Sequence, residues 1–118
     1  MIFRPELAVK VMEGSKTVTR RLCSDNPRSP WWREVCAFEV GRDYAVQAKR
    51  GTPAIGRIRV LDVRRETLMP VAVGPDKDRE ARWEGFESPE AFIDAWREIN
   101  GQWDVLAEVW RVQFEVAR

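Results

Sequence analysis

The residues of this sequence that are best suited to chemistry lie together in one short segment. Six consecutive positions, residues 16–21, hold one lysine, two threonines and two arginines: Lys16, Thr17, Thr19, Arg20 and Arg21. An apolar core does not require such a concentration of charged and hydroxyl groups, each of which needs a polar partner when it is buried. The segment therefore predicts contact with an anion or another polar ligand.

Lys16 and Thr19 have two possible arrangements of catalytic roles. A threonine hydroxyl is a poor nucleophile until a base removes its proton. Lys16 can be that base only if burial or the neighbouring cations Arg20 and Arg21 lower its pKa, whereas a close carboxylate would keep it charged, as a stabiliser of a developing oxyanion. The chain contains no histidine, so any catalysis must use lysine, carboxylates or hydroxyls. Both arrangements need a turn between Lys16 and Thr19, because strand alternation does not place residues three apart on one face.

A second candidate segment contains Glu84, which lies between Trp83 and Phe86. An apolar surrounding favours the neutral form of a carboxyl group, which can then donate a proton to a leaving amine. The alternative is that Glu84 ends a charged helix, pairs with Arg82 or faces water. Trp83 offers an indole ring that can stack on a nucleobase.

Together the two segments resemble the ASCH family. Residues 14–21 read Gly-x-Lys-Thr-x-Thr-x-Arg after a first helix, and residues 84–92 read Glu-Gly-Phe-x-Ser-x-x-x-Phe before a helix that contains Trp96. The opening Phe3-Arg4-Pro5 and the turn at residues 40–43 also fit. The likeness implies an α+β fold, a small PUA-like mixed β-barrel with two or three flanking helices, formed by one domain over residues 1–118.

The resemblance also implies candidate functions and residue roles. The family includes small amidohydrolases that remove the acyl group from N4-acylated cytidines, and their proposed lysine, threonine and glutamate correspond here to the candidate catalytic residues Lys16, Thr19 and Glu84. The other candidate ligand contacts are Thr17, Arg20, Arg21 and Trp83.

The first function we expect is binding of RNA or a modified nucleoside in a polar cleft formed by residues 16–21 and 84–86. RNA binding would weaken steeply with salt. The alternative is hydrolysis of N4-acylcytidine-type nucleosides, for which binding would depend weakly on salt. The Trp-rich loop at residues 30–33 and a longer C-terminal half depart from the amidohydrolases and leave the substrate open.

Composition bounds these choices. A chain of 118 residues forms one domain that needs neither metal nor disulfide for its core. No apolar run approaches the ~20 residues of a membrane span, and no secretory signal is visible, so we expect a cytoplasmic protein without membrane contact. Cys23 and Cys36 lie thirteen residues apart and read as reduced thiols. We expect neither a metal nor a cofactor.

The charges are unevenly distributed along the chain. Residues 1–65 hold fourteen Lys and Arg against seven Asp and Glu, and residues 66–118 hold six against twelve. This asymmetry indicates one basic face if the N-terminal cations converge in space, and solvated strand faces if they do not.

Hydrophobic periodicity predicts three helices. The first covers residues 5–13 and ends at Gly14, and the second covers residues 76–83. The third begins at Ser88 and stops at residues 100–101. Its expected buried face consists of Phe92, Ala95, Trp96 and Ile99.

Alternating patterns predict the strands. A strand enters at residues 17–19, and another within residues 38–50 places Tyr44, Val46 and Ala48 on one face. A strand at residues 55–65 shifts its parity at Leu61, which indicates a bulge. A short edge strand is expected around Val71.

The last strand is expected at residues 109–116. Its pattern places Trp110, Val112, Phe114 and Val116 inward and Arg111, Gln113 and Glu115 outward. Residues 22–34 read as a loop, in which Trp31 and Trp32 either stack on bases or anchor the loop to the barrel.

Overall fold

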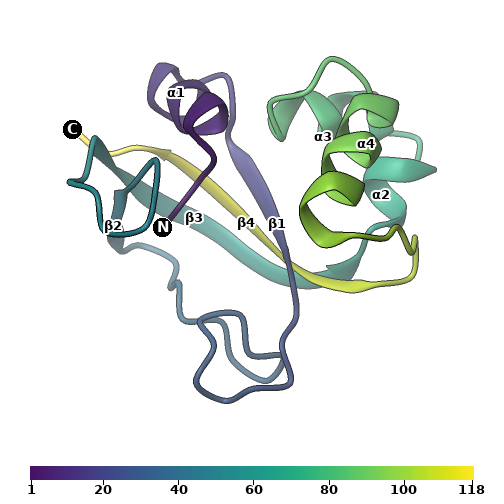
Figure 1. Cartoon of the computed structure of the whole chain (residues 1–118), viewed down its shortest axis with the longest axis horizontal. Coiled ribbons are helices and arrows are strands. Elements are labelled where there is room, and N and C mark those ends of the chain that lie inside the picture. The colour runs from purple at the N-terminus through teal and green to yellow at the C-terminus, as the bar shows by residue number, and fades with distance from the viewer.

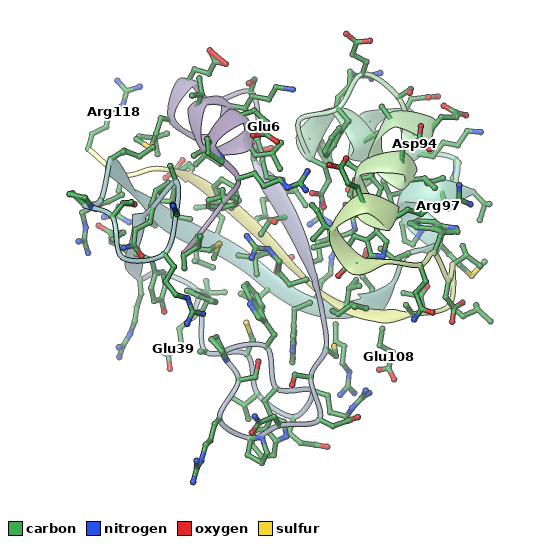
Figure 2. All side chains as sticks on the ribbon, viewed as in Figure 1. Glu6, Glu39, Asp94, Arg97, Glu108 and Arg118 are labelled. Carbon is green, nitrogen blue, oxygen red and sulfur yellow. The ribbon has the colours of Figure 1, made fainter.

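Four helices and four strands make up the computed structural model, which describes all residues 1–118 (Figure 1). In chain order they are α1 (Pro5–Glu13), β1 (Val18–Leu22), β2 (Asp43–Val46), β3 (Gly56–Thr67), α2 (Met69–Ala72), α3 (Lys77–Trp83), α4 (Pro89–Asn100) and β4 (Glu108–Val116). Charged side chains such as Glu6, Asp94 and Arg97 are exposed on α1 and α4 (Figure 2). None of the helices has the length and apolar character that crossing a bilayer requires.

The strands form one antiparallel sheet in the order β1-β4-β3-β2. β3 and β4 are long and curved and cross the middle of the molecule (Figure 1). Val60 pairs with Phe114 and Asp62 with Gln113, so Leu61 is an extra residue in β3. The predicted bulge at this position is confirmed, and bulges of this kind bend a sheet. The result is a curled half-barrel, in keeping with the predicted α+β barrel-like fold.

Two hydrophobic clusters cover the two faces of β4. The first gathers Val112 and Phe114 with residues of α1, β2, β3 and the N-terminal segment, and Trp110 packs against it. The second gathers Val109 with Leu68 and residues of α2, α3 and α4. Because both faces are covered, β4 is an interior strand, and its alternation does not separate core from solvent.

The prediction that Arg111 faces outward is wrong, because its face of β4 is also covered. It is 1% exposed, since α3 lies over its face of the sheet, and its Nη2 donates to both carboxylate oxygens of Glu80 at 3.2 and 3.3 Å. Its Nε and Nη1 have no hydrogen-bond partner.

Two other local predictions are wrong. The segment around Val71 is the short helix α2, not an edge strand, and Val71 is fully buried against the α3–α4 layer. Pro70 in the first turn suits a helix, because its missing N–H has no partner there in any case. Ile99 is 53% exposed, because the last turn of α4 reaches beyond the second cluster.

Other local predictions agree with the structure, but no turn separates Lys16 from Thr19: the turn lies at residues 14–15, and Lys16 precedes β1. α1 ends at Gly14, which has a left-handed backbone with φ +87°. Ser88 Oγ accepts from the Ala91 N–H at 3.1 Å and caps α4. The Trp-containing loop is anchored: Trp31 packs on the first cluster, and the Trp32 carbonyl accepts from the Trp110 indole at 2.9 Å.

Candidate functional site

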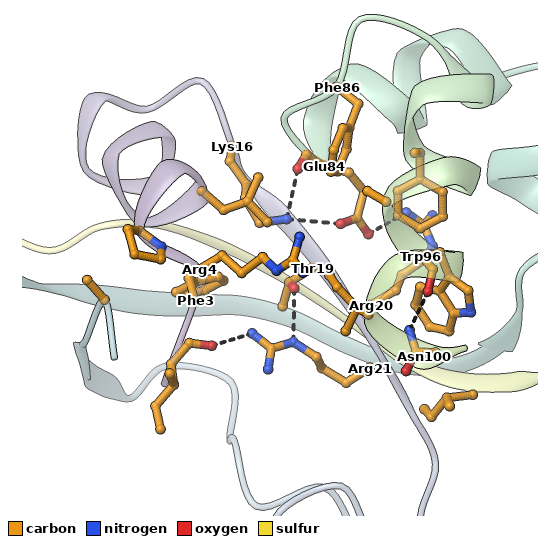
Figure 3. A pocket seen from close by; sticks show the side chains of 18 of the residues that line it. Phe3, Arg4, Lys16, Thr19, Arg20, Arg21, Glu84, Phe86, Trp96 and Asn100 are labelled. Carbon is orange, nitrogen blue, oxygen red and sulfur yellow. Dashed lines mark hydrogen bonds and ion pairs between the residues drawn. The ribbon is translucent and has the colours of Figure 1, made fainter. Parts of the chain in front are cut away.

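A cavity of about 440 Å³ runs along the outer edge of β1 (Figure 3). Its walls come from the N-terminal segment, α1, β1, the turn after β2, the segment that follows α3, and α4. Apolar side chains form much of the lining, among them Phe3, Leu7, Phe86, Phe92, Trp96 and Ile99. Its size lies within the range typical of small-molecule sites.

Lys16, Arg20 and Glu84 lie together in the lining of this cavity and form its polar end (Figure 3), and the Lys16 side chain is almost fully buried. The chain reverses at Gly14, where the Ser15 and Lys16 N–H groups both donate to the Lys10 carbonyl. The Lys16 ammonium then donates to three oxygens, the Val18 carbonyl at 2.7 Å and the carbonyl and Oε1 of Glu84 at 2.9 Å each. Burial lowers the pKa of Lys16, while the carboxylate of Glu84 opposes this shift.

Glu84 follows the last residue of α3 as its C-cap, and the next residue has a left-handed backbone. Gly85 has φ +96°, and a Cβ there would lie 3.3 Å from Lys10 Cδ and 3.4 Å from Lys16 Cβ. Glycine is therefore required between Glu84 and Phe86. Glu84 Oε1 accepts from Lys16 and Oε2 from Arg20 Nη1 at 3.0 Å, so the carboxylate is fixed between two cations.

Arg20 points to the opposite face of β1 from Thr19 and connects β1 to α3 and β3. Its Nε donates to Glu66 at 3.2 Å, its Nη2 to Glu80 at 2.8 Å and its Nη1 to Glu84. Although burial opposes it, the surrounding carboxylates, Glu84 foremost, raise the pKa of Arg20. With each of its three nitrogens donating to a protein carboxylate, Arg20 holds Glu84 in position and is neutralised within the protein.

Thr19 and Arg21 lie on the other face of β1, where they also line the cavity. Thr19 Oγ1 accepts from Arg21 Nε at 3.3 Å, and Arg21 Nη2 donates to the Ile2 carbonyl at 2.7 Å. The guanidinium carbon lies 5.3 Å from the ring centroids of both Phe3 and Trp31. Burial lowers the pKa of Arg21.

The structure therefore brings together Lys16, Thr19 and Glu84, with Arg20 and Arg21 beside them. Thr17 and Trp83 do not line the cavity. They are neighbours of each other, since the Thr17 N–H donates to the Trp83 carbonyl at 2.8 Å. The Trp83 ring lies under Arg79 and Arg111, at 5.2 and 5.9 Å from their guanidinium carbons.

Several lining residues had not been predicted as site residues: Phe3, Arg4, Lys49, Arg50, Trp96 and Asn100. They come from three separate elements, and no local pattern joins them. The family resemblance had included Phe3, Arg4 and Trp96 without giving them a role, and for Lys49 and Arg50 the charge asymmetry of the chain was the signal. This asymmetry is explained in part here, because all the cationic residues of the cavity come from the basic N-terminal half: Arg4, Lys16, Arg20, Arg21, Lys49 and Arg50. Glu84 is the only acidic residue in the lining.

Two comparisons by sequence found no relative: no protein-family model and no curated protein matches the chain. Solved structures do match. An ASCH domain from Lactobacillus crispatus JV V101 superposes with a TM-score of 0.60 at 16% identity, over 94% of this chain and 70% of that one. The DUF984 protein of Enterococcus faecalis V583 superposes with a TM-score of 0.65 at 18% identity, over 95% and 70% of the two chains.

The chain therefore has the ASCH fold.

At these identities the likeness establishes the fold and not the activity. Within this ASCH fold, Lys16, Thr19 and Glu84 line one cavity, although Glu84 lies 68 positions after Lys16 in the chain. No group of three or more histidine, cysteine or acidic side chains is placed to hold a metal ion.

Proposed function

We propose that the cavity binds the nucleoside part of a ligand, either a nucleotide of RNA or a modified nucleoside. The observation that carries this proposal is the fixed Lys16–Glu84 pair at the polar end of a cavity of about 440 Å³ with apolar and aromatic walls. A nucleoside has the matching form, because it joins a flat apolar ring with polar edges to a hydroxylated sugar.

The carboxylate of Glu84 supports recognition of a base amine. Its oxygens accept from Lys16 and Arg20, and each carboxylate oxygen has a second lone pair. Carboxylates pair with the exocyclic amine of cytosine in known recognition. The aromatic walls offer stacking surfaces, which contribute roughly 1–3 kcal/mol per base.

The test is calorimetric titration with cytidine, N4-acetylcytidine, adenosine and uridine, and with a short RNA. Thr19→Val removes a hydroxyl that faces the cavity, and Thr17→Val makes the same change two residues away, outside it. We expect Thr19→Val to weaken binding by about tenfold, the value of one hydrogen bond to a charged or polar group, and Thr17→Val to leave it unchanged. Absence of binding for all of these ligands would overturn the proposal.

Amide hydrolysis is a second candidate, favoured because Lys16, Thr19 and Glu84 line the same cavity. Hydrolysis would add water across the acyl C–N bond of an N4-acylcytidine and release the carboxylic acid and the cytosine amine, which takes up a proton. The three donors of Lys16 are already directed at oxygens, which suits a charged lysine that holds Glu84 in place better than a base. The nucleophile would then be the Thr19 hydroxyl or a water, and Glu84, the only carboxylate in the lining, would take its proton and pass it to the leaving cytosine amine.

Turnover of N4-acetylcytidine to cytidine, followed by chromatography, tests this candidate. Hydrolysis by the wild type and by Thr17→Val, together with its loss in folded Thr19→Val, would establish the enzyme. Equal turnover in both threonine variants would remove Thr19 from the chemistry. Ligand binding without turnover would leave the binding function alone.

A further inference from the structure

The cations of the cavity fall into two groups. Lys16 and Arg20, at the polar end, are neutralised by carboxylates at 2.8–3.2 Å. Arg21, Lys49 and Arg50 also line the cavity, but none of them forms an ion pair within the protein. Arg4 belongs to neither group, because it forms an ion pair with Glu98 at 3.4 Å, but this pair is exposed on the surface. The second group therefore carries positive charge that only a ligand or solvent can neutralise.

Arg21 is held rigidly despite having no carboxylate partner. Two of its nitrogens are fixed by Thr19 Oγ1 and the Ile2 carbonyl, and its guanidinium lies beside Phe3 and Trp31. Its Nη1 donates to no protein atom. A guanidinium that is fixed beforehand loses little entropy when it binds an anion.

The N-terminal segment brings Lys49 and Arg50 to the same cavity, although β1 and β2 form opposite edges of the sheet. The Ile2 carbonyl accepts a hydrogen bond from Arg21, and Ile2 also forms an isolated parallel β-bridge with Gln47. The Phe3 N–H donates to the Gln47 carbonyl at 3.0 Å. The turn that carries Lys49 and Arg50 follows Gln47 directly. Both of these cations are exposed and make no side-chain hydrogen bond.

We propose that Arg21, Lys49 and Arg50 bind the phosphate of a phosphorylated nucleoside, so that the ligand of this cavity is a nucleotide and not an uncharged nucleoside. This inference rests on the proposed nucleoside-binding function. A phosphomonoester carries nearly two negative charges near neutral pH, and arginine matches its oxygens with paired N–H donors. Glu84 sets the orientation of the nucleotide in the cavity. Its carboxylate repels the phosphate from the polar end, and it accepts a hydrogen bond there from an amine of the base.

The test compares each ribonucleoside with its 5′-monophosphate by calorimetric titration at low salt. Three proteins are used: the wild type, the double variant Lys49→Ala/Arg50→Ala, and the control double variant Arg82→Ala/Arg118→Ala. The control removes the same charge from exposed arginines that lie outside the cavity and form no ion pair. Arg118 is at the far end of the molecule from α4 (Figure 2).

We expect the 5′-monophosphate to bind the wild type and the control at least about tenfold more tightly than the nucleoside, and the advantage to fall to about twofold in Lys49→Ala/Arg50→Ala. A 5′-phosphorylated trinucleotide, compared with its unphosphorylated form, separates two sources of this group. If the 5′-phosphate raises the affinity of the trinucleotide as much as that of the mononucleotide, the ligand is the 5′ end of an RNA. If it raises the affinity of the mononucleotide alone, the ligand is a free nucleotide.

Two results would overturn the inference. Equal affinities of nucleoside and monophosphate in the wild type would refute phosphate binding while leaving the nucleoside site intact. If Lys49→Ala/Arg50→Ala still binds the 5′-monophosphate at least about tenfold more tightly than the nucleoside, Lys49 and Arg50 do not bind the phosphate. Failure of every nucleoside and nucleotide to bind would instead refute the proposed function, and this inference with it.

Discussion

At the scale of single residues, the site depends on the backbone of Gly85 as much as on the charge of Glu84. Gly85 has a left-handed conformation and lies against Lys10 and Lys16. An alanine there meets a conformational penalty and one contact that is tighter than usual, with Lys10 Cδ at 3.3 Å, so we expect it to disturb the position of Glu84 between Lys16 and Arg20.

Gly85→Ala is therefore expected to lower the free energy of unfolding by more than the roughly 1–2 kcal/mol that a left-handed alanine costs, and to weaken ligand binding. Gly41→Ala is the matched control, because Gly41 has φ +85° and a Cβ there would meet no atom within 4 Å. It carries the conformational cost alone and leaves binding unchanged. Urea unfolding and calorimetric titration measure the two effects, and equal losses in both variants would contradict the account.

At the scale of elements, α3 is attached to the sheet through Glu80. This carboxylate accepts from Arg20 in β1 and Arg111 in β4. Although burial opposes the shift, the hydrogen bond and charge of Arg20, with those of Arg111, hold the pKa of Glu80 below its ordinary value of 4.5. Its stabilising contribution is therefore complete above that pH and is lost as the pH falls through the lower folded-state pKa.

We expect the free energy of unfolding to decrease below about pH 4.5 and Glu80→Gln to flatten this decrease. At neutral pH the same variant should lose about 3–5 kcal/mol, because the buried Arg111 loses its only charged partner and Arg20 loses one of three. Glu87→Gln is the control, since Glu87 is exposed and forms no ion pair. Denaturant unfolding at a series of pH values gives the slopes. A slope in Glu80→Gln equal to that of the wild type would show that other carboxylates cause the acid sensitivity.

At the scale of the whole molecule, β4 joins two hydrophobic clusters that lie on its opposite faces. Neither cluster can lose β4 without exposing the other, so we expect the two to unfold in one transition. Far-ultraviolet circular dichroism and tryptophan fluorescence should give coincident denaturation curves. Val112→Ala in the first cluster and Val109→Ala in the second should each shift both curves together, by about 1–3 kcal/mol. Two separated transitions would show that the clusters are independent units.

The sequence alone determined the features that depend on neighbours in the chain. The bounds of α1 and the caps of α4 follow from proline, serine and glycine at fixed positions, and the parity shift at Leu61 identified the bulge. The two motifs also selected Lys16, Thr19 and Glu84, which do lie around one cavity.

Only the tertiary structure decided which faces are covered and which distant charges meet. Arg111 has the alternation of a solvent-facing residue, and its burial follows from the position of α3, which no strand pattern encodes. Arg21 lines the same cavity as Lys49 and Arg50, and the N-terminal segment links them, because the Ile2 carbonyl accepts from Arg21 and Ile2 bridges to Gln47. Local periodicity reports the two sides of an element, whereas the partner on each side is set by long-range packing.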